Sequence, residues 1–534
     1  MTVRPTTTVI VWGTSSGAGK SLLATALCRW AARAGLDVAP YKAQNMSNNA
    51  RVVPVWTPGG VSAPEGGPGT IGTNDAAGAF GALGALGEIG SAQYFQALAA
   101  RAAPHTGMNP VLLKPERDTA SQVVVNGRVD TALSRMGWRE RSTTLADAAR
   151  QGFERLADRH AVLVVEGAGS PAEINLAPQD YVNLGTARWA RARGACRALL
   201  VTDIDRGGAF AHLHGTWALL PGDLRPLLAG FVLNKFRGDA ALLAPGPQQL
   251  QALTGVPLLG VLPMRRDHGL PEEDGLASGP AHLPDGAGTP AGQRVAIIAW
   301  PHLSNLDEFQ PLAAATPVRW VRHPAELDGT DWLVLPGSKQ VSGDLAWLRA
   351  RGLDAAIRRY AAAGRPVLGI CGGLQVMGEW LDDPDGADGD PHGPLPGLGL
   401  LPLATRYAAP KRLRAAPVQF GPGPAAWPTA SHAAWRPLAG LRWPAYEIRC
   451  GRTEPTAATA QPVLFDAEAR PVGWLGGPAG NVLGIATHGL FEDAGVLRAL
   501  LGQRVRTLDQ VFDGLADLVD EHLGAAMLRA LFQA

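Results

Sequence analysis

One stretch near the start of the chain restricts its fold more than any other. An apolar run, TTVIVWG (7–13), passes directly into GTSSGAGKS (13–21), and the helical sequence LLATALCRWAARAG follows. Glycines allow backbone N–H groups to turn inward around phosphate oxygens, and a helix N-terminus behind them adds positive potential. The order strand, glycine-rich loop, Lys-Ser and helix therefore predicts a P-loop at the carboxyl end of a buried strand.

The spacing of this loop gives its residues separate tasks. Lys20 is expected to reach the β- and γ-phosphates, and the Ser21 hydroxyl to ligate Mg²⁺. The usual first glycine is replaced by Thr14, with Gly13 one place earlier, a variant that resembles the dethiobiotin synthetase branch of P-loop enzymes. The candidate phosphate-binding residues of the loop are Gly13, Thr14, Gly17, Gly19, Lys20 and Ser21.

Two further strand ends complete the predicted nucleotide site. Glu166 ends AVLVVEG (161–167) and is placed to hold Mg²⁺ directly or through water. The segment NKFRGD (234–239) begins like the guanine-reading NKxD motif, but Arg237 stands where the acidic residue would be. ATP is therefore the expected nucleotide, with Mg²⁺ as its metal and Asn234 as a candidate adenine contact.

Short runs of Val, Ile and Leu alternate with longer Ala/Leu/Arg helical stretches along the rest of the chain. This alternation is typical of parallel strands buried by crossover helices. The predicted strands cover residues 7–13, 161–167, 196–203, 228–235 and 256–263, then 294–301, 331–337, 365–371 and 481–489. A Gly/Pro/acidic segment separates the two groups, as a linker would.

These patterns predict an α/β fold of two domains, each a mainly parallel sheet flanked by helices. A chain of 534 residues is too long for one core. The expected division is a P-loop domain at 1–265, a linker at 266–293 and a second domain at 294–534 that includes a C-terminal helical segment. Residues 52–87 and 382–396, rich in Gly, Pro and Ala or Asp, are predicted surface loops.

Charge and cysteine content narrow the functional classes. The net charge is +1 and the sequence pI is about 7.8, so no general attraction to nucleic acid or acidic membranes is implied. The four cysteines are scattered without a CxxC pair, and the N-terminus has no signal-peptide pattern. A soluble, cytoplasmic protein with small-molecule partners is expected, and no feature of the sequence indicates an oligomeric state.

The second predicted domain contains a candidate nucleophile. In GICGG (369–373), Cys371 ends a strand and is flanked by glycines, the form of a nucleophile elbow. The start of a helix stabilises a thiolate and lowers the pKa of the thiol. His488, at the end of GIATHG, is far away in sequence but can meet Cys371 in one sheet and act as its base.

This domain resembles the class I glutamine amidotransferases. The resemblance implies an oxyanion hole from the N–H of Gly372 and one from LPGSK (335–339), supplied by Gly337 or Ser338. The family commonly carries a glutamate two residues beyond the histidine, but Leu490 stands there. Glu492 and Asp493 are then nearby candidates for the third residue, or Cys371 and His488 work as a dyad.

Several further motifs together resemble the cobyric acid synthase family. They are KAQNMSNN (42–49), GEIGSAQ (87–93), MNPVLLKPERDTASQVVVNGR (108–128), EGAGSPAEINL (166–176), DIDRGGAF (203–210), NKFRGD (234–239), LPEED (270–274), LPGSK (335–339), GICGG (369–373), YEI (446–448) and THG (487–489). The resemblance implies that the P-loop domain activates carboxylates of adenosylcobyrinic acid a,c-diamide as acyl phosphates, and that ammonia from glutamine converts four of them to amides. It also implies substrate or phosphate contacts near Asn45, Asp118, Ser121 and Asp203.

Two alternatives stay open at this point. One is cobyrinic acid a,c-diamide synthase, a related two-domain amidotransferase that acts earlier on the same macrocycle. The other is an ATP-binding regulatory protein with an inactive glutaminase domain, against which intact Lys20, Cys371 and His488 argue. Glutamine hydrolysis separates an enzyme from such a regulator.

Overall fold

The computed structural model describes residues 5–56, 85–117, 120–265, 268–271, 293–421, 427, 433–502 and 505–533. These residues form two compact units. The first contains the described residues up to Leu270 and, again, those from Leu508 onward; the second contains the described residues of Pro271–Thr507.

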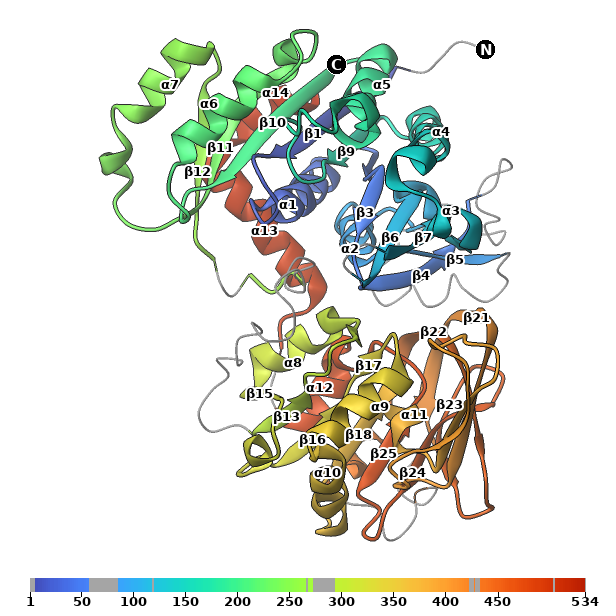
Figure 1. Ribbon diagram of the computed structural model, residues 1–534. Coiled ribbons are helices and arrows are strands. Elements are labelled where there is room, and N and C mark those ends of the chain that lie inside the picture. Colours follow the sequence, from blue (N-terminus) through green and yellow to red (C-terminus); the bar gives the residue numbers. More distant parts are fainter. Residues whose placement is uncertain are drawn as a thin grey trace. The chain divides into compact units, whose positions relative to one another are not determined.

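The first unit is built around a six-stranded, wholly parallel sheet (Figure 1). In sheet order its strands are β12 (Leu258–Pro263), β11 (Leu228–Phe236), β10 (Cys196–Asp203), β1 (Thr7–Gly13), β9 (Val162–Glu166) and β2 (Val38–Tyr41). Five of the predicted strands are thus confirmed, with small differences at their ends.

Helices cover both faces of this sheet because its strands are apolar on both sides. Along β1, Val9 and Val11 belong to one core, and Ile10 and Trp12 to the other. The first core includes α1 (Lys20–Arg33), α13 (Leu508–Leu523) and α14 (Ala525–Phe532). The second includes α4 (Trp138–Arg159), α5 (Thr186–Arg193), α6 (Ala209–Leu219) and α7 (Gly246–Thr254).

Shorter elements extend the first unit beside β2. A four-stranded sheet contains β3 (Gln44–Met46), β6 (Val111–Arg117), β7 (Ala120–Val125) and β8 (Arg128–Asp130). The strands β4 (Ala50–Pro54) and β5 (Leu86–Gly90) pair antiparallel and are followed by α2 (Ser91–Ala99), and α3 (Thr131–Arg135) follows β8. The predicted surface loop at 52–87 therefore begins and ends in paired strands, and its part at 57–84 lies outside the described residues.

The second unit has an eleven-stranded sheet whose first half is parallel. The parallel strands are β15 (Val318–Val321), β13 (Val295–Ile298), β16 (Trp332–Leu335), β18 (Val367–Ile370) and β25 (Val482–Ile485). The other strands, most of them antiparallel to their neighbours, are β24 (Pro471–Gly476), β23 (Gln461–Phe465), β21 (Leu403–Phe420), β22 (Arg442–Pro455), β19 (Trp380–Asp383) and β20 (His392–Pro396). The α/β class is confirmed, and the second sheet is mixed rather than mainly parallel.

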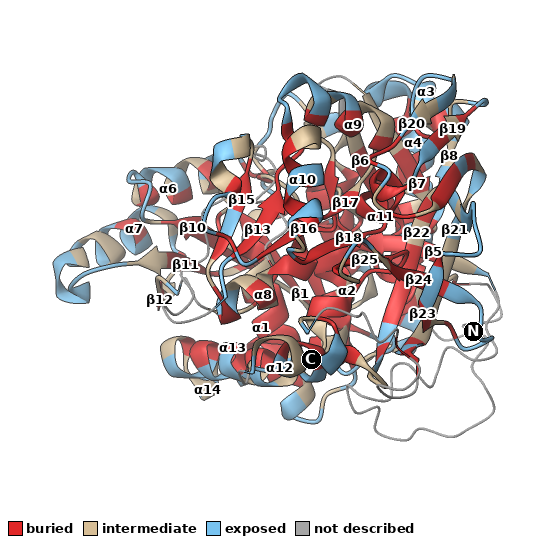
Figure 2. Ribbon diagram, turned by 90° about the horizontal axis from the view of Figure 1, so that it is seen from below, coloured by how far each residue is buried: buried red, intermediate tan, exposed pale blue. Residues whose placement is uncertain are grey.

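Helices of the second unit pack on the parallel half of its sheet, and the strands between them are buried (Figure 2). They are α8 (Gln310–Ala315), α9 (Val341–Ala350), α10 (Leu353–Ala362), α11 (Gly372–Met377) and α12 (Ala494–Leu501). The segment 382–396, predicted to be a loop, begins and ends in strands, so that prediction is wrong at both ends. Asp388 within it accepts hydrogen bonds from the N–H groups of Val341 and Ser342 and so caps α9.

The predicted division at 294–534 differs from the structure at the C-terminus. Residues from Leu508 onward were expected in the second domain because they follow it in sequence, but α13 packs against α1 of the first unit. Arg29 of α1 forms ion pairs with Asp513, at 2.8 Å, and Asp509, at 3.2 Å. Among the described residues, no helix is both long and apolar enough to cross a bilayer.

Candidate functional site

The glycine-rich loop leaves β1 and is fixed by its neighbours before α1 begins. The Thr14 N–H donates to the carbonyl of Val201 at 3.0 Å, and Gly17 and Gly19 adopt positive φ angles of 71° and 100°. Lys20 opens α1, and its Nζ donates to the Ser15 carbonyl at 2.9 Å and that of Gly169 at 3.2 Å. The ammonium group thus lies inside the loop, as the P-loop prediction requires.

Close packing explains why glycine occupies Gly13 and Gly19. A Cβ on Gly13 would lie 3.0 Å from side-chain atoms of Lys20, and one on Gly19 would lie 1.9 Å from Asn234 Nδ2. That same Asn234 amide donates a hydrogen bond to the carbonyl of Ala18 at 3.0 Å, so Asn234 helps to hold the glycine-rich loop in place. A contact between Asn234 and adenine stays a prediction.

A buried polar cluster surrounds Glu166 at the end of β9. Its Oε1 accepts hydrogen bonds from Ser21 Oγ and Lys42 Nζ, both at 2.8 Å, and its Oε2 accepts one from Gln96 Nε2. Burial alone would raise the pKa of Glu166, but the Lys42 ammonium and the hydrogen bonds from Gln96 and Ser21 hold that pKa below its ordinary value. The carboxylate is therefore ionised within the folded protein.

Lys42 and Gln96 were not predicted as site residues. Lys42 begins the KAQNMSNN motif and Gln96 follows GEIGSAQ by three residues, so position beside the motifs was the only available signal. The donor set also fits a magnesium ion. A hydroxyl and a carboxylate are oxygen ligands of the kind that Mg²⁺ prefers, and the Lys42 ammonium already brings positive charge to this carboxylate.

The predicted substrate residues lie in two places. Asn45 in β3 is buried, and Ser121 in β7 is half-buried; the two strands flank β6 in the same small sheet. Asp203 lies in the main sheet at the end of β10, where its Oδ2 pairs with Lys235 at 3.1 Å and Arg206 at 3.4 Å. Asp118 lies outside the described residues.

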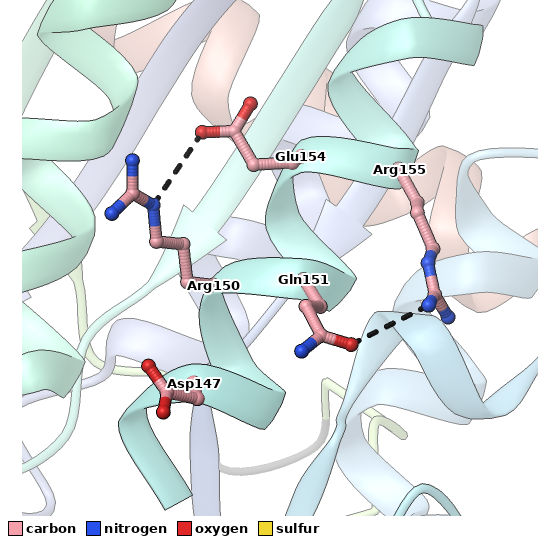
Figure 3. Close-up of a pocket in the computed structure, with 5 residues that line it drawn as sticks. All are labelled: Asp147, Arg150, Gln151, Glu154 and Arg155. Carbon is pink, nitrogen blue, oxygen red and sulfur yellow. Dashed lines mark hydrogen bonds and ion pairs between the residues drawn. The ribbon is translucent and has the colours of Figure 1, made fainter. Parts of the chain in front are cut away.

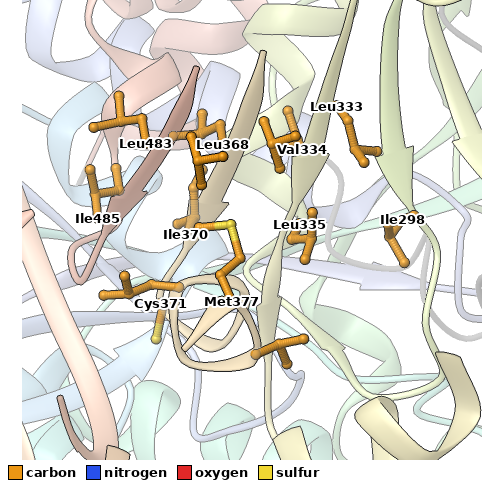
Figure 4. Close-up of a cluster of buried hydrophobic side chains, with 14 of the residues drawn as sticks. Ile298, Leu333, Val334, Leu335, Leu368, Ile370, Cys371, Met377, Leu483 and Ile485 are labelled. Carbon is orange, nitrogen blue, oxygen red and sulfur yellow. The ribbon is translucent and has the colours of Figure 1, made fainter. Parts of the chain in front are cut away.

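In the second unit, Cys371 lies on a strained turn between β18 and α11. Its backbone has φ 51° and ψ −103°, a conformation that non-glycine residues rarely adopt. Gly373 permits the tight packing of this turn, because a Cβ there would lie 1.9 Å from the Leu335 carbonyl oxygen. Figure 4 shows Cys371 below the apolar side chains of β18 and β25, at the strand end. The predicted elbow is present.

His488 lies beyond the end of β25, the strand next to β18, and its imidazole is close enough to Cys371 for the two side chains to interact. Its Nδ1 lies 3.1 Å from Oε1 of Glu308, whose Oε2 accepts the N–H of Gly489 at 2.9 Å. Burial alone would lower the pKa of His488, but the charges of Glu308 and Cys371 raise it to about 10. The imidazole is then protonated near neutral pH, the state that stabilises a neighbouring thiolate.

Glu308 is the carboxylate partner of His488, a position that the sequence left open between Glu492, Asp493 and a dyad without a carboxylate. The carboxylate comes from η9 (Leu306–Phe309), a 3₁₀ turn before α8, and is fully buried. Asp493, one of the two candidates named from the sequence, instead caps α12 by accepting the Val496 N–H at 2.9 Å. Glu308 is 180 residues from His488 and carries no motif, so the sequence offered no signal for it.

The expected oxyanion loop lies beside the elbow. The strand β17 (Gly337–Ser338) pairs antiparallel with β14 (Leu303–Ser304). The Lys339 N–H donates to the His302 carbonyl, and bonded pairs alternate along such a ladder, so the Ser338 N–H points away from β14. The nitrogen of Ser338 lies 2.7 Å from where a Cβ on Gly372 would be. Ser338 Oγ donates to buried Asp344 at 2.5 Å, which holds the loop in place. Ser338 is therefore the better candidate for the second donor.

Gly337 has a different role. A Cβ at this position would lie 2.9 Å from Cε1 of His488, so glycine leaves room for the imidazole. Its carbonyl accepts a hydrogen bond from Nε1 of Trp300 at 3.1 Å.

A hollow of about 260 Å³ on the surface of the first unit is lined by residues unlike those of the two candidate sites (Figure 3). All of its lining residues come from α4: Asp147, Arg150, Gln151, Glu154 and Arg155. They interact with one another along the helix, as in the pair Arg150 and Glu154 at 4.0 Å. No function is assigned to this face.

Comparison with known proteins accounts for both units. Residues 9–276 match the CobQ/CobB/MinD/ParA nucleotide binding domain, and residues 294–496 match the CobB/CobQ-like glutamine amidotransferase domain. The chain is 55% identical to the cobyric acid synthase of Leptothrix cholodnii, over 99% of this chain and 97% of that protein. The chain belongs to the cobyric acid synthase family. The family's proteins from Methylibium petroleiphilum and Variovorax paradoxus are also 55% identical, over 99% and 98% of this chain and 98% of each relative.

Because the chain belongs to the cobyric acid synthase family, its nucleotide-binding site and its glutamine amidotransferase site are two sites of one enzyme. The nucleotide-binding domain contains the P-loop with Lys20, and the glutamine amidotransferase domain contains Cys371, His488 and Glu308. Glutamine-dependent amidation in cobalamin biosynthesis is the activity of the family.

Proposed function

We propose that this chain uses ATP and glutamine to amidate four side-chain carboxylates of adenosylcobyrinic acid a,c-diamide, giving adenosylcobyric acid, and that it does so in the cytoplasm. The observation that carries the proposal is the arrangement of Cys371, His488 and Glu308 in a chain whose other unit has a complete P-loop. Likeness to the cobyric acid synthases over almost the whole chain supports the choice of substrate.

The glutaminase half begins with the Cys371 thiolate, which attacks the carboxamide carbon of glutamine. The N–H groups of Gly372 and Ser338 are the proposed donors to the oxyanion that forms. The His488 imidazolium, oriented by Glu308, gives its proton to the departing ammonia and leaves a thioester on Cys371. Neutral His488 then takes a proton from water, which hydrolyses the thioester to glutamate and restores the thiolate.

In the P-loop half, the substrate carboxylate attacks the γ-phosphate of ATP to give an acyl phosphate and ADP. Lys20 is the proposed partner of the β- and γ-phosphates, and Lys42 can neutralise charge beside Glu166. Ser21 and Glu166 would hold Mg²⁺, which neutralises phosphate charge during transfer. Ammonia then attacks the acyl carbon, and phosphate leaves as the amide forms.

The test follows the masses of corrinoid products after incubating the purified protein with adenosylcobyrinic acid a,c-diamide, ATP, Mg²⁺ and glutamine. We expect conversion of four carboxyl groups to amides. The Cys371→Ala variant should lose this activity with glutamine and keep it with added ammonia, because the P-loop half needs ammonia and not its source.

Two results would contradict the proposal. Amidation of cobyrinic acid instead of its a,c-diamide would identify the earlier synthase. A folded Cys371→Ala variant that loses the ammonia-dependent reaction as well would show that the two halves do not divide the work as described.

A further inference from the structure

The ring of Tyr446 lies against the imidazole of His488. The two ring centroids are 5.2 Å apart and the ring planes differ by 21°. The backbones of these residues form an antiparallel bridge, in which the His488 N–H donates to the Tyr446 carbonyl at 2.9 Å. Residues paired in this way place their side chains next to each other. The path of the chain therefore enforces the stack.

Asn305 holds the other end of Tyr446. Its Nδ2 donates to the tyrosine hydroxyl at 2.9 Å, and this contact is buried. Asn305 adopts a left-handed conformation, with φ 52°, immediately before η9, and η9 carries Glu308. One short segment thus supplies a carboxylate to the edge of the imidazole and an amide to the tyrosine that covers its face.

We propose that Tyr446 and Asn305 are positioning residues of the glutaminase reaction: Tyr446 fixes the plane of the His488 imidazole and stabilises its charged form, and Asn305 fixes Tyr446. This inference rests on the proposed role of His488 as the acid and base for Cys371.

The physical reason is the freedom of the imidazole ring. Rotation of a histidine ring about its Cβ–Cγ bond is only weakly restricted, yet this ring must keep Nδ1 on Glu308 while it serves Cys371. A flat ring against its face removes the tilting motion. An aromatic face also attracts a cation, more strongly where water is excluded, and His488 is 2% exposed.

Replacing Tyr446 removes none of the charged groups near His488, because all of them belong to other residues. Glu308 and Cys371 face the imidazole directly. Next to Tyr446 and Thr487, a small cavity is also lined by the charged residues Arg414, Glu447 and Asp466. A change in the titration of His488 in a Tyr446 variant is therefore attributable to the lost ring.

The first experiment measures glutamate release as a function of pH for Tyr446→Leu and Tyr446→Phe. The leucine variant should lose about 10- to 100-fold in kcat with KM within about twofold, because misplacing a catalytic group by a small distance has effects of this size. Its imidazolium should lose its proton about one pH unit lower, seen also in the pH dependence of Cys371 alkylation by iodoacetamide. The phenylalanine variant keeps the ring and should lose no more than about fivefold, and its pH dependence should match the wild type.

The second experiment tests the hydrogen bond. Asn305→Gly accepts the positive φ and removes the amide, so it should lose about as much kcat as Tyr446→Phe. Because both changes delete the same bond, the double variant should lose no more than either single variant. Independent, multiplying losses would overturn the role of Asn305.

Trp443→Leu is the matched control, because Trp443 is a buried aromatic of the same strand that packs against Phe420. It should leave the pH dependence unchanged. The proposal for Tyr446 is overturned if Tyr446→Leu keeps the wild-type pH dependence, or if it loses no more kcat than Tyr446→Phe. Should the leucine variant not fold, the phenylalanine variant decides: a pH dependence shifted as far as one unit despite the retained ring refutes the proposal. A wild-type protein that releases no glutamate would instead refute the proposed function.

Discussion

Glu308 shows that a carboxylate can keep its place in a site while its place in the sequence changes. Leu490 stands where amidotransferases usually carry the glutamate, and it is fully buried. The carboxylate reaches His488 from a turn that follows β14, the second strand of the second unit in chain order. Geometry, not spacing from the histidine, thus decides which acidic residue orients the base.

The first prediction at this scale is that Glu308→Gln lowers glutamate release by about 10²- to 10⁴-fold, while ammonia-dependent amidation is unchanged. A neutral amide no longer balances the charge of the imidazolium, so the pKa of His488 should fall from about 10. As the pH rises, the variant should therefore lose its imidazolium, and with it the remaining activity, at a lower pH than the wild type does. The measurement is glutamate release between pH 6 and pH 10 at saturating glutamine. Glu492→Gln is the control and should stay within about threefold, and equal losses in the two variants would refute the assignment.

The second prediction concerns Lys20, whose ammonium lies among loop carbonyls where phosphate oxygens are expected. Lys20→Ala should lower amide formation at least about 100-fold with either glutamine or ammonia, because charge developing on the phosphates loses its partner. Glutamate release in the same variant serves as the internal control and should persist. Wild-type amidation with ammonia would remove the P-loop assignment.

At the scale of elements, most of the parallel strands could be predicted from sequence and the long hairpin could not. Runs of Val, Ile and Leu such as the one in residues 196–203 are typical of strands that are buried on both faces of a sheet. The strand β10 has the bounds predicted from this run. The strand β21, in contrast, contains LATRYAAPKRLRAAPVQF, which is rich in Ala and Arg and only partly buried, so no apolar period marks it. The elbow was predictable because a local turn needs local glycines, whereas Glu308 depends on contacts made only after folding.

The elbow and the oxyanion loop act as one unit, and the third prediction tests it. Gly372→Ala places a Cβ 2.7 Å from the Ser338 nitrogen, so one of the two backbones must move. Loss of one oxyanion donor lowers turnover by about 10²- to 10³-fold, so we expect glutamate release to fall by that amount with little change in the P-loop reaction. Gly393→Ala is the control, since a Cβ at Gly393 meets nothing within 4 Å. Similar kinetics for the two variants would contradict the proposed oxyanion hole.

At the scale of the whole molecule, the second unit is an insertion into the first. The chain leaves the first unit at Leu270 and returns to it at Leu508. Its last helices then pack on α1, which carries Lys20 and Ser21 at its start. Trp30 of α1 illustrates the fit: its Nε1 donates to Asp520 at 2.8 Å, and its ring stacks on Phe532. The nucleotide site therefore depends on residues at the far end of the sequence.

The fourth prediction is that a chain ending at Thr507 loses the P-loop reaction and keeps glutamate release. The removed helices bury Val511, Phe512, Leu515, Val519, Leu528 and Leu531 in the first unit. Each large apolar side chain contributes about 1.5–3 kcal/mol on burial, and a domain is stable by only about 5–15 kcal/mol, so the first unit should not stay folded. Arg29, which is 2% exposed, would also lose both ion-pair partners on α13.

Calorimetry of the full chain should show a transition that ATP moves to higher temperature, and the truncated chain should lack it. Asp517→Ala is the control, because this exposed partner of Arg33 should change the stability of the first unit by no more than about 1 kcal/mol.

A truncated chain that still amidates with ammonia at the wild-type rate would show that the first unit folds without the packing of α13 on α1. Persistent glutamate release in the inactive chain would show that the second unit folds with Cys371, His488 and Glu308 in place, since all three lie within Pro271–Thr507.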